Sequence, residues 1–154
     1  MRECYTTAMI NVVMVWLEND RHELLLARRA DHKKQDPGLW GPSVTGKVEP
    51  GETFEQALVR EANEELMLKP GSYTPRFLLE TDFLHPDGET RHFKIYVAQI
   101  SNDAAHGLRP DPNEVAEIRW LSMTKIQTML NTKPGEVVVA SAFVLWSKIF
   151  AMLD

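Results

Sequence analysis

Several carboxylates crowd into one short stretch of the sequence. Glu61, Glu64 and Glu65 are spaced i, i+3 and i+4, which places them on one side of a helix. Carboxylates at this spacing repel one another, and their position late in the helix is unfavourable for anions because of the helix dipole. A divalent cation such as Mg²⁺, which prefers oxygen ligands, would offset both penalties. From spacing alone, a solvated acidic face with a weak salt bridge between Arg60 and Glu64 is the simpler explanation.

The sequence around these carboxylates predicts the helix that must carry them. Thr53 followed by Gln56 fits a capping box at its start, and Pro70-Gly71 would stop it after about Leu66–Leu68. Its apolar stripe comprises Leu58, Ala62 and Leu66. The loop Lys47–Glu52, with Gly46 just before it, leads into this helix.

Strand and helix patterns alternate along the rest of the chain. Strands are expected over Thr6–Trp16, Leu24–Arg28, Ser43–Gly46, Tyr73–Phe83, His92–Ile100 and Val115–Leu121. Two further helices are expected over Ser122–Leu130 and Glu136–Leu153, and loops over Ala30–Trp40 and Ser101–Asn113. Polar turns predict two hairpins, one joining the first two strands and one at Pro86-Asp87-Gly88. The pattern predicts an α/β fold with a mixed sheet, in a single domain over residues 1–154.

Composition narrows the classes of function. The 17 Lys and Arg against 22 Asp and Glu give a net charge of −5, which argues against binding to a nucleic-acid polymer. Cys4 is the single cysteine, so an internal disulfide and a multi-cysteine zinc site are excluded. The apolar run Ala8–Leu17 is too short to span a membrane, and the cytoplasm is the expected compartment. The apolar C-terminal helix could cover the core or form a homodimer contact.

The whole string from Gly46 to Leu68 resembles the Nudix box of the Nudix hydrolases, G-x5-E-x7-R-E-U-x-E-E-x-G-U with U aliphatic. The polar and glycine positions that match are Gly46, Glu52, Arg60, Glu61, Glu64 and Glu65. Ala62 and Leu68 stand at aliphatic positions, and Met67 replaces the usual glycine. The resemblance implies the Nudix fold, with a mixed sheet sandwiched between helices.

The resemblance also implies a reaction, which is Mg²⁺-dependent cleavage of a phosphoanhydride in a nucleoside triphosphate or a related nucleoside-diphosphate-linked substrate. Mn²⁺ could substitute for Mg²⁺. The implied metal ligands are Glu61, Glu64, Glu65 and the backbone carbonyl of Thr45. Glu61 would alternatively serve as or orient the general base, and Arg60 would position the carboxylates. Glu114, six residues before Trp120, is a second candidate for the base or the metal site, although a plain polar loop residue explains it as well.

Several basic side chains lie shortly before the box and at its start. The candidate substrate-binding residues are Arg28, Arg29, Lys33, Lys34 and Lys47. They could bind the phosphates of a substrate, or they could form a solvated basic loop. Binding of phosphates there would explain how an acidic chain holds a polyanion.

Two alternatives concern the substrate. The segment from Leu24 to Trp40 also resembles isopentenyl diphosphate isomerase, a relative with the same fold, in which a catalytic Cys and a metal-binding His stand where this chain has Thr45 and Lys47. A Thr hydroxyl is a far weaker acid than a thiol, which favours hydrolysis. The loop Ser43-Val44-Thr45-Gly46 resembles that of dihydroneopterin triphosphate pyrophosphatases, a weaker alternative.

Overall fold

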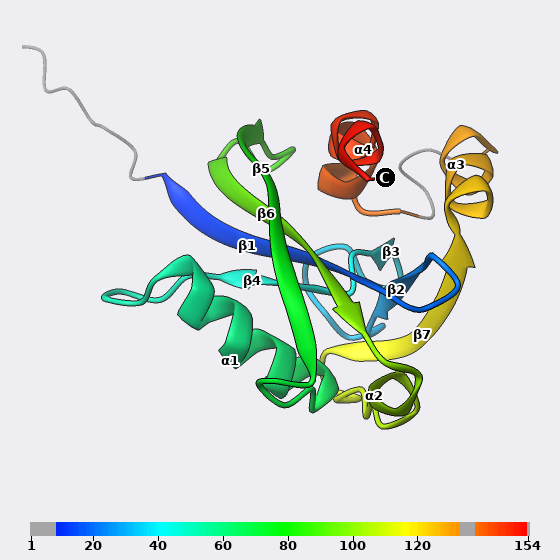
Figure 1. Ribbon diagram of the computed structural model, residues 1–154. Helices are drawn as coiled ribbons and strands as arrows, with labels where there is room; N and C mark the ends of the chain where they lie inside the picture. Colours follow the sequence, from blue (N-terminus) through cyan, green and yellow to red (C-terminus); the bar gives the residue numbers. More distant parts are fainter. Residues whose placement is uncertain (1–8, 133–137, 154) are drawn as a thin grey trace, which may run out of the picture.

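The computed structural model describes residues 9–132 and 138–153 and places a mixed β-sheet between helices (Figure 1). The strands are β1 (Ile10–Glu18), β2 (Glu23–Arg29), β3 (Trp40–Gly41), β4 (Val44–Lys47), β5 (Tyr73–Leu84), β6 (Thr90–Ile100) and β7 (Val115–Ser122). The helices are α1 (Phe54–Leu66), α2 (Asn102–His106), α3 (Met123–Thr132) and α4 (Ala140–Met152). Helix α1 lies on one side of the sheet, with α3 and α4 on the other. The expected α/β/α sandwich is confirmed.

The sheet is mixed because one central pair of strands is parallel. Strands β1 and β6 run parallel over the whole length of β1, while the other pairs are antiparallel. The hairpin predicted around Pro86-Asp87-Gly88 is formed by β5 and β6. The hairpin predicted for the first two strands is formed but is short, because β1 and β2 pair antiparallel only at Glu18 and Leu24 before they separate. Strand β4 pairs instead with β1 over Val12–Val15.

Ser43 holds the point at which β1 and β2 separate. Its hydroxyl accepts a hydrogen bond from the Leu17 N–H at 2.8 Å and donates one to the Leu25 carbonyl at 2.6 Å. The side chain is buried, so it satisfies two backbone groups that the gap would otherwise leave unpaired. The chain passes from β3, on β2, to β4, on β1, through Ser43. This crossing brings Thr45, Gly46 and Lys47 opposite α1.

Two apolar layers hold the helices on the sheet. Under α1 the buried residues include Val13, Val15, Leu58, Ala62 and Leu66, the last three being the predicted stripe. On the opposite face, α3 and α4 pack through Ile126, Leu130, Trp146 and Ile149, and the rings of Trp16 and Trp146 are 5.4 Å apart. In the described part of the chain, none of the helices has the length and apolar character needed to cross a membrane.

Two predicted boundaries differ from the structure. The predicted loop Ser101–Asn113 contains the short helix α2, which Ser101 caps by accepting from the Ala104 N–H at 3.1 Å. The predicted C-terminal helix begins at Ala140 rather than Glu136, which lies outside the described residues together with the rest of 133–137. Val139 is extended, and its N–H donates to the Trp40 carbonyl at 2.8 Å. Because the Val139 N–H is used in this pairing, and because β-branched residues favour extended backbone, the helix does not begin before Ala140.

Met67 ends α1 at the position where the box pattern has glycine. Its φ of 53° and ψ of 34° are left-handed, and its N–H bonds to the carbonyls of Ala62 and Asn63. Met67 therefore adopts the left-handed conformation that a glycine usually adopts at the end of a helix. Because its side chain is 61% exposed, Met67 gains little burial in return for this conformation.

Met67→Gly is expected to raise the free energy of unfolding by about 1 kcal/mol. A left-handed conformation costs a non-glycine residue about 1–2 kcal/mol, part of which is offset by the greater freedom of glycine in the unfolded chain. Urea denaturation of both proteins measures the difference. Asn63→Gly, at an exposed position inside α1, is the control and should lower stability. A Met67→Gly protein no more stable than the parent would contradict the strain argument.

His92 on β6 lies opposite two carboxylates of β5. Its Nδ1 is 2.5 Å from Asp82 Oδ1, and its Nε2 is 3.0 Å from Glu80 Oε2. The hydrogen bond to Asp82, followed by that to Glu80, raises the pKa of His92 above its usual 6.5. The protonated imidazole is therefore more favourable in the folded protein than in the unfolded chain.

His92→Gln is expected to reduce stability most below about pH 6.5 and least above the raised pKa, since the stabilisation requires the protonated ring and disappears as pH rises through that pKa. Urea denaturation of the parent and the variant at about pH 5.5 and about pH 9 measures this change. A difference in stability that stays constant between the two conditions would contradict it.

Candidate active site

A cavity of about 530 Å³ opens between α1, strand β4 and the face of the sheet near the start of α4. The residues predicted from the sequence that line it are Arg28, Arg29, Lys33, Thr45, Lys47, Glu61, Glu64, Glu65 and Glu114. Arg60 lies just behind them, bound to two of the glutamates. Lys34 is exposed and lies outside this lining. The fold therefore brings residues from four separated segments into one cavity.

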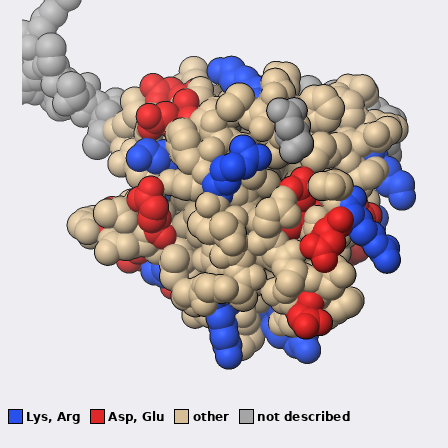
Figure 2. All heavy atoms as spheres, viewed as in Figure 1, with Lys and Arg blue, Asp and Glu red and all other residues tan. Residues whose placement is uncertain are grey.

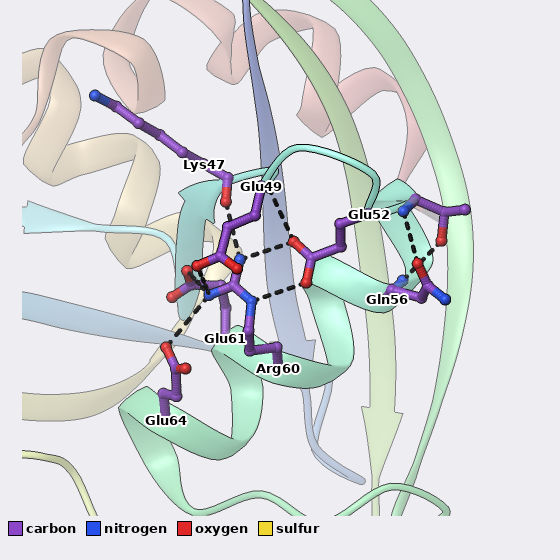
Figure 3. A network of polar contacts seen from close by, with 8 residues as sticks. Lys47, Glu49, Glu52, Gln56, Arg60, Glu61 and Glu64 are labelled. Carbon is purple, nitrogen blue, oxygen red and sulfur yellow. Dashed lines mark hydrogen bonds and ion pairs between the residues drawn. The ribbon is translucent and has the colours of Figure 1, made fainter.

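Arg60 is the centre of the polar network beneath the cavity (Figure 3). Its Nε and Nη2 donate to the two oxygens of Glu52, both at 2.9 Å. Its Nη1 is 2.7 Å from Glu61 Oε1 and 3.3 Å from Glu64 Oε2, and Nη2 also donates to the Lys47 carbonyl at 3.0 Å. These hydrogen bonds lower the pKa of Glu52 to about 2 and join the loop before α1 to the helix.

The position of the Glu61 side chain leaves no room for a side chain at residue 46, which is glycine. A Cβ built on Gly46 would lie 2.3 Å from Glu61 Cδ and 2.5 Å from its Oε1. The Glu61 side chain is only 13% exposed and is held by Arg60, so it occupies the space where a side chain at residue 46 would be. Glycine at this position thus lets a carboxylate of α1 lie against strand β4.

The surroundings of Glu61 and Glu65 make ionisation of their carboxyl groups less favourable. Burial raises the pKa of Glu61, although the hydrogen bond from Arg60 opposes this effect. Burial raises the pKa of Glu65 well above its usual value, and the neighbouring charge of Glu61 raises it further; the backbone of Thr45 only partly opposes these effects by a hydrogen bond. Ionisation of these two carboxyl groups is therefore less favourable here than in water, mainly because of their burial.

The donor atoms suit a hard divalent cation. Glu61, Glu64 and Glu65 offer carboxylate oxygens on one cavity wall, and a cation there would offset the charge that Glu61 and Glu65 carry. Within residues 9–132 and 138–153, no three His, Cys, Asp or Glu side chains are arranged to hold a metal ion. Two of the glutamates instead bond to Arg60. The oxygen donors of these residues suit Mg²⁺, and in this structure the carboxylates of Glu61 and Glu64 are paired with the guanidinium of Arg60.

Basic side chains form another part of the cavity wall. Lys33 Nζ is 2.7 Å from Glu114 Oε2, which fixes the position of this carboxylate, and Arg29 Nε donates to the Gln35 carbonyl at 2.8 Å. Arg28 pairs with Asp31 and Glu117 across β2 and β7. On the face in Figure 2, Lys and Arg are likewise interspersed with Asp and Glu. Arg28 and Lys33 thus line the cavity while they are paired with carboxylates.

The sequence did not identify another group of lining residues. These are Gln35, Asp36, Arg91 and Asp111. His85 and Phe93, which lie near the predicted hairpin and from the sequence could flank a base or pack in the core, also line the cavity. Arg91 and Phe93 alternate on β6, and the parallel register places Phe93 beside Val12 on β1. This alternation would have put both residues on one face. That this face lies in the cavity depends on the pairing of β1 with β6, which no nearby residues in the sequence indicate.

The chain matches known proteins over most of its length. The family model described as NUDIX domain matches residues 8–140. An isopentenyl-diphosphate Delta-isomerase from Enterobacter sp. (strain 638) is 34% identical over 125 residues, which cover 77% of this chain and 64% of that protein. Another isopentenyl-diphosphate Delta-isomerase, from Paenarthrobacter aurescens (strain TC1), is 35% identical over 136 residues, which cover 85% of this chain and 67% of that protein. The chain thus spans about two thirds of the length of these relatives.

Solved structures share the fold. The crystal structure of DR0079 from Deinococcus radiodurans has a TM-score of 0.74 and 25% identity, and the match covers 96% of this chain and 89% of that one. The similarity therefore includes both helical layers and the sheet between them.

Proposed function

Because this chain belongs to the NUDIX family, we propose that it hydrolyses a phosphoanhydride bond in a nucleoside triphosphate or a related diphosphate-linked substrate, with Mg²⁺ as cofactor. The observation that carries the proposal is the meeting of three glutamates of α1 with Lys33, Lys47 and Arg29 in one cavity. Phosphoryl transfer depends on positioning the phosphates and on neutralising their charge, and this set of side chains can do both.

In this proposal, the α1 glutamates hold the metal. Glu61, Glu64, Glu65 and the carbonyl of Thr45 would supply its oxygen ligands. When bound, Mg²⁺ neutralises phosphoryl oxygens and makes water more acidic. Arg60 orients Glu61 and Glu64 through its hydrogen bonds and also fixes the loop carbonyl of Lys47. This Arg acts through the carboxylates and does not contact the substrate.

Other residues of the cavity bind phosphates and move the proton. Lys33, Lys47, Arg28 and Arg29 would donate to phosphate oxygens. Glu114 is held 2.7 Å from Lys33 Nζ on the same wall, and it would accept the proton of the attacking water.

Isomerisation of isopentenyl diphosphate is the second candidate, because the curated relatives described above, and six others like them, carry that name. Thr45 and Lys47 occupy the positions that the resemblance gives to its Cys and His, and both line the cavity. A Thr hydroxyl is a poor proton donor to a double bond, since it is a much weaker acid than a thiol. Hydrolysis is therefore the better supported reaction.

A panel assay with Mg²⁺ tests the proposal. Standard and modified nucleoside triphosphates, diphosphate-linked nucleotides and dihydroneopterin triphosphate are incubated with the protein, and phosphate and pyrophosphate are measured. We expect release from at least one nucleotide and its loss on chelation of the metal. In parallel, isopentenyl diphosphate is examined for conversion to its allylic isomer. Conversion without release from any nucleotide would overturn the hydrolase assignment.

A further inference from the structure

Arg29 differs from the other basic side chains of the cavity, because one edge of its guanidinium is fixed and the other is free. Its Nε donates to the Gln35 carbonyl at 2.8 Å, whereas Nη1 and Nη2 have no hydrogen-bond or ion-pair partner within residues 9–132 and 138–153. Lys33 and Arg28 are instead paired with carboxylates. Arg29 also lines the cavity, so its free nitrogens are available to a ligand there.

The free edge of Arg29 suits a phosphate group. A guanidinium presents two N–H groups in a planar fork that matches two oxygens of a phosphate, which a lysine ammonium cannot do. Burial raises the pKa of the Glu65 carboxyl group, and the charge of Arg29 offsets a small part of this effect, so the guanidinium lies within electrostatic range of that carboxylate. A fork for phosphate thus lies near the carboxylates to which the proposed function assigns the metal.

The Gln35 carbonyl that fixes Arg29 belongs to the loop 30–39, which starts from Arg29 and returns to it. The Arg29 N–H donates to the Leu39 carbonyl at 2.9 Å, and the Gly38 N–H donates to the Arg29 carbonyl at 3.1 Å. These bonds fix the two ends of the loop, whereas Gln35 lies in its middle. The position of the Gln35 carbonyl therefore depends on what holds the middle of the loop.

The side chain of Gln35 joins the middle of this loop to the hairpin of β5 and β6. Its amide oxygen accepts from Arg91 Nη1 at 3.3 Å, from Arg91 Nη2 at 3.1 Å and from His85 Nε2 at 2.9 Å. Arg91 and His85 are each only 9% exposed. Asp87 fixes both, since its carboxylate accepts from Arg91 Nη2 at 2.8 Å and its N–H donates to His85 Nδ1 at 3.1 Å. These buried partners hold the amide in one position, and we call the three residues Gln35, His85 and Arg91 the Gln35 anchor.

We propose that Gln35 is a positioning residue, which uses its anchored side chain to hold its own carbonyl against Arg29 and so keeps the free edge of that guanidinium ready for a diphosphate. An Arg side chain that is already held at Nε loses less conformational freedom when it binds a ligand than one that moves freely. Gln35 acts through Arg29 and does not itself contact the phosphates. This inference rests on the proposed function for the diphosphate class of the substrate, although not for the bond that is broken.

Gln35→Ala tests the proposal through the binding of methylenediphosphonate, a diphosphate analogue that cannot be hydrolysed, measured by calorimetry with Mg²⁺. We expect Kd to rise about three- to tenfold, because the loop carbonyl loses its hold and Arg29 must then be ordered on binding. The matched control is Gln127→Ala, which removes another half-buried amide that accepts from Trp146 Nε1 at 2.9 Å but lies outside the cavity lining. This control should leave Kd unchanged. A Kd for Gln35→Ala equal to that of the parent overturns the proposal.

A double-mutant cycle shows whether Gln35 acts through Arg29. In the Arg29→Met background the fork is absent, so Gln35→Ala should then change Kd less than about twofold. In the Lys47→Met background, where the missing cation belongs to β4 and not to the loop, Gln35→Ala should still raise Kd about three- to tenfold. An equal effect of Gln35→Ala in both backgrounds overturns the proposal, because Gln35 would then act independently of Arg29.

Steady-state kinetics with a nucleotide that the protein cleaves gives a result that a purely structural role of Gln35 would not. In Gln35→Ala we expect KM to rise by about the same factor as Kd, while kcat stays within about twofold of the parent. Loss of folded protein would instead lower kcat and leave KM unchanged, and that outcome overturns the proposal.

The binding experiment also separates this inference from the proposed function. Weaker binding of methylenediphosphonate in Gln35→Ala that disappears in the Arg29→Met background supports the Gln35 anchor even when no nucleotide is cleaved, a result that overturns the hydrolase assignment alone. Cleavage of nucleotides without this dependence on Arg29 overturns the positioning role and leaves the hydrolase intact. A parent protein that binds no methylenediphosphonate overturns the diphosphate site at Arg29 and the role of Gln35 with it.

Discussion

Glu65→Gln is expected to lower kcat/KM for the best nucleotide substrate at least about tenfold, and Glu64→Gln to do the same. An amide keeps the shape of the side chain but is a much weaker ligand for Mg²⁺ than a carboxylate. The free energy of unfolding should not fall in Glu65→Gln, because the carboxylate it replaces is buried and lies near the charge of Glu61. Activity would thus be lost without a loss of stability.

Steady-state kinetics over a range of Mg²⁺ concentrations, together with urea denaturation, checks both parts of this expectation. The matched control is Glu55→Gln, on the same helix but outside the cavity lining. Glu55 accepts a hydrogen bond from the Tyr96 hydroxyl at 2.9 Å, which an amide oxygen can also accept, so the control should retain activity. Full activity in both Glu64→Gln and Glu65→Gln would overturn the assignment of these residues to the metal.

Gly46→Ala is the second change with a large expected effect, again a fall in kcat/KM of at least about tenfold. The new methyl group would overlap the Glu61 carboxyl group, 2.3 Å from its Cδ, and push it away from Arg60 and out of the cavity. The methyl group would also lie 2.6 Å from Glu61 Cγ, so the whole side chain must move and its ion pair with Arg60 breaks; the free energy of unfolding should therefore also fall, by about 1–3 kcal/mol.

Kinetics and thermal unfolding of Gly46→Ala measure the two effects separately. Gly107→Ala is the control, since a Cβ there would meet its nearest neighbours at 3.5 Å, an ordinary contact, and its φ of −84° suits alanine. A Gly46→Ala protein with the activity of the parent would show that Glu61 can act from another position. A large loss of stability with proportional loss of activity would show that Gly46 serves the fold alone.

The helix that carries the glutamates could be predicted closely from the sequence, because its signals are local. The capping box of Thr53 and Gln56 is present with both hydrogen bonds, and Leu66 is the last helical residue. The α/β class with a mixed sheet followed from the alternation of strands with helices, and the sandwich of the sheet between helices followed from the resemblance to the Nudix fold. The box pattern also identified the family, although Met67 departs from it, since a residue in the left-handed conformation still ends the helix.

The pairing of distant strands could not be predicted in the same way. A polar turn predicts that β1 and β2 form a hairpin, but Ser43 and β4 occupy most of the edge of β1 that β2 would need. Likewise, Arg91 gave no signal as a cavity residue, because its place depends on the parallel register of β1 and β6. Such contacts join residues far apart in the chain, where spacing within the sequence is uninformative.

The cavity draws its two sets of side chains from different secondary-structure elements. The glutamates belong to α1, whereas Arg91 and Phe93 belong to β6, and the hydrogen bonds of Arg60 do not extend to either of these β6 residues. Exchange of residues on β6 and in its turn should therefore retune which molecules are accepted without disturbing bond cleavage.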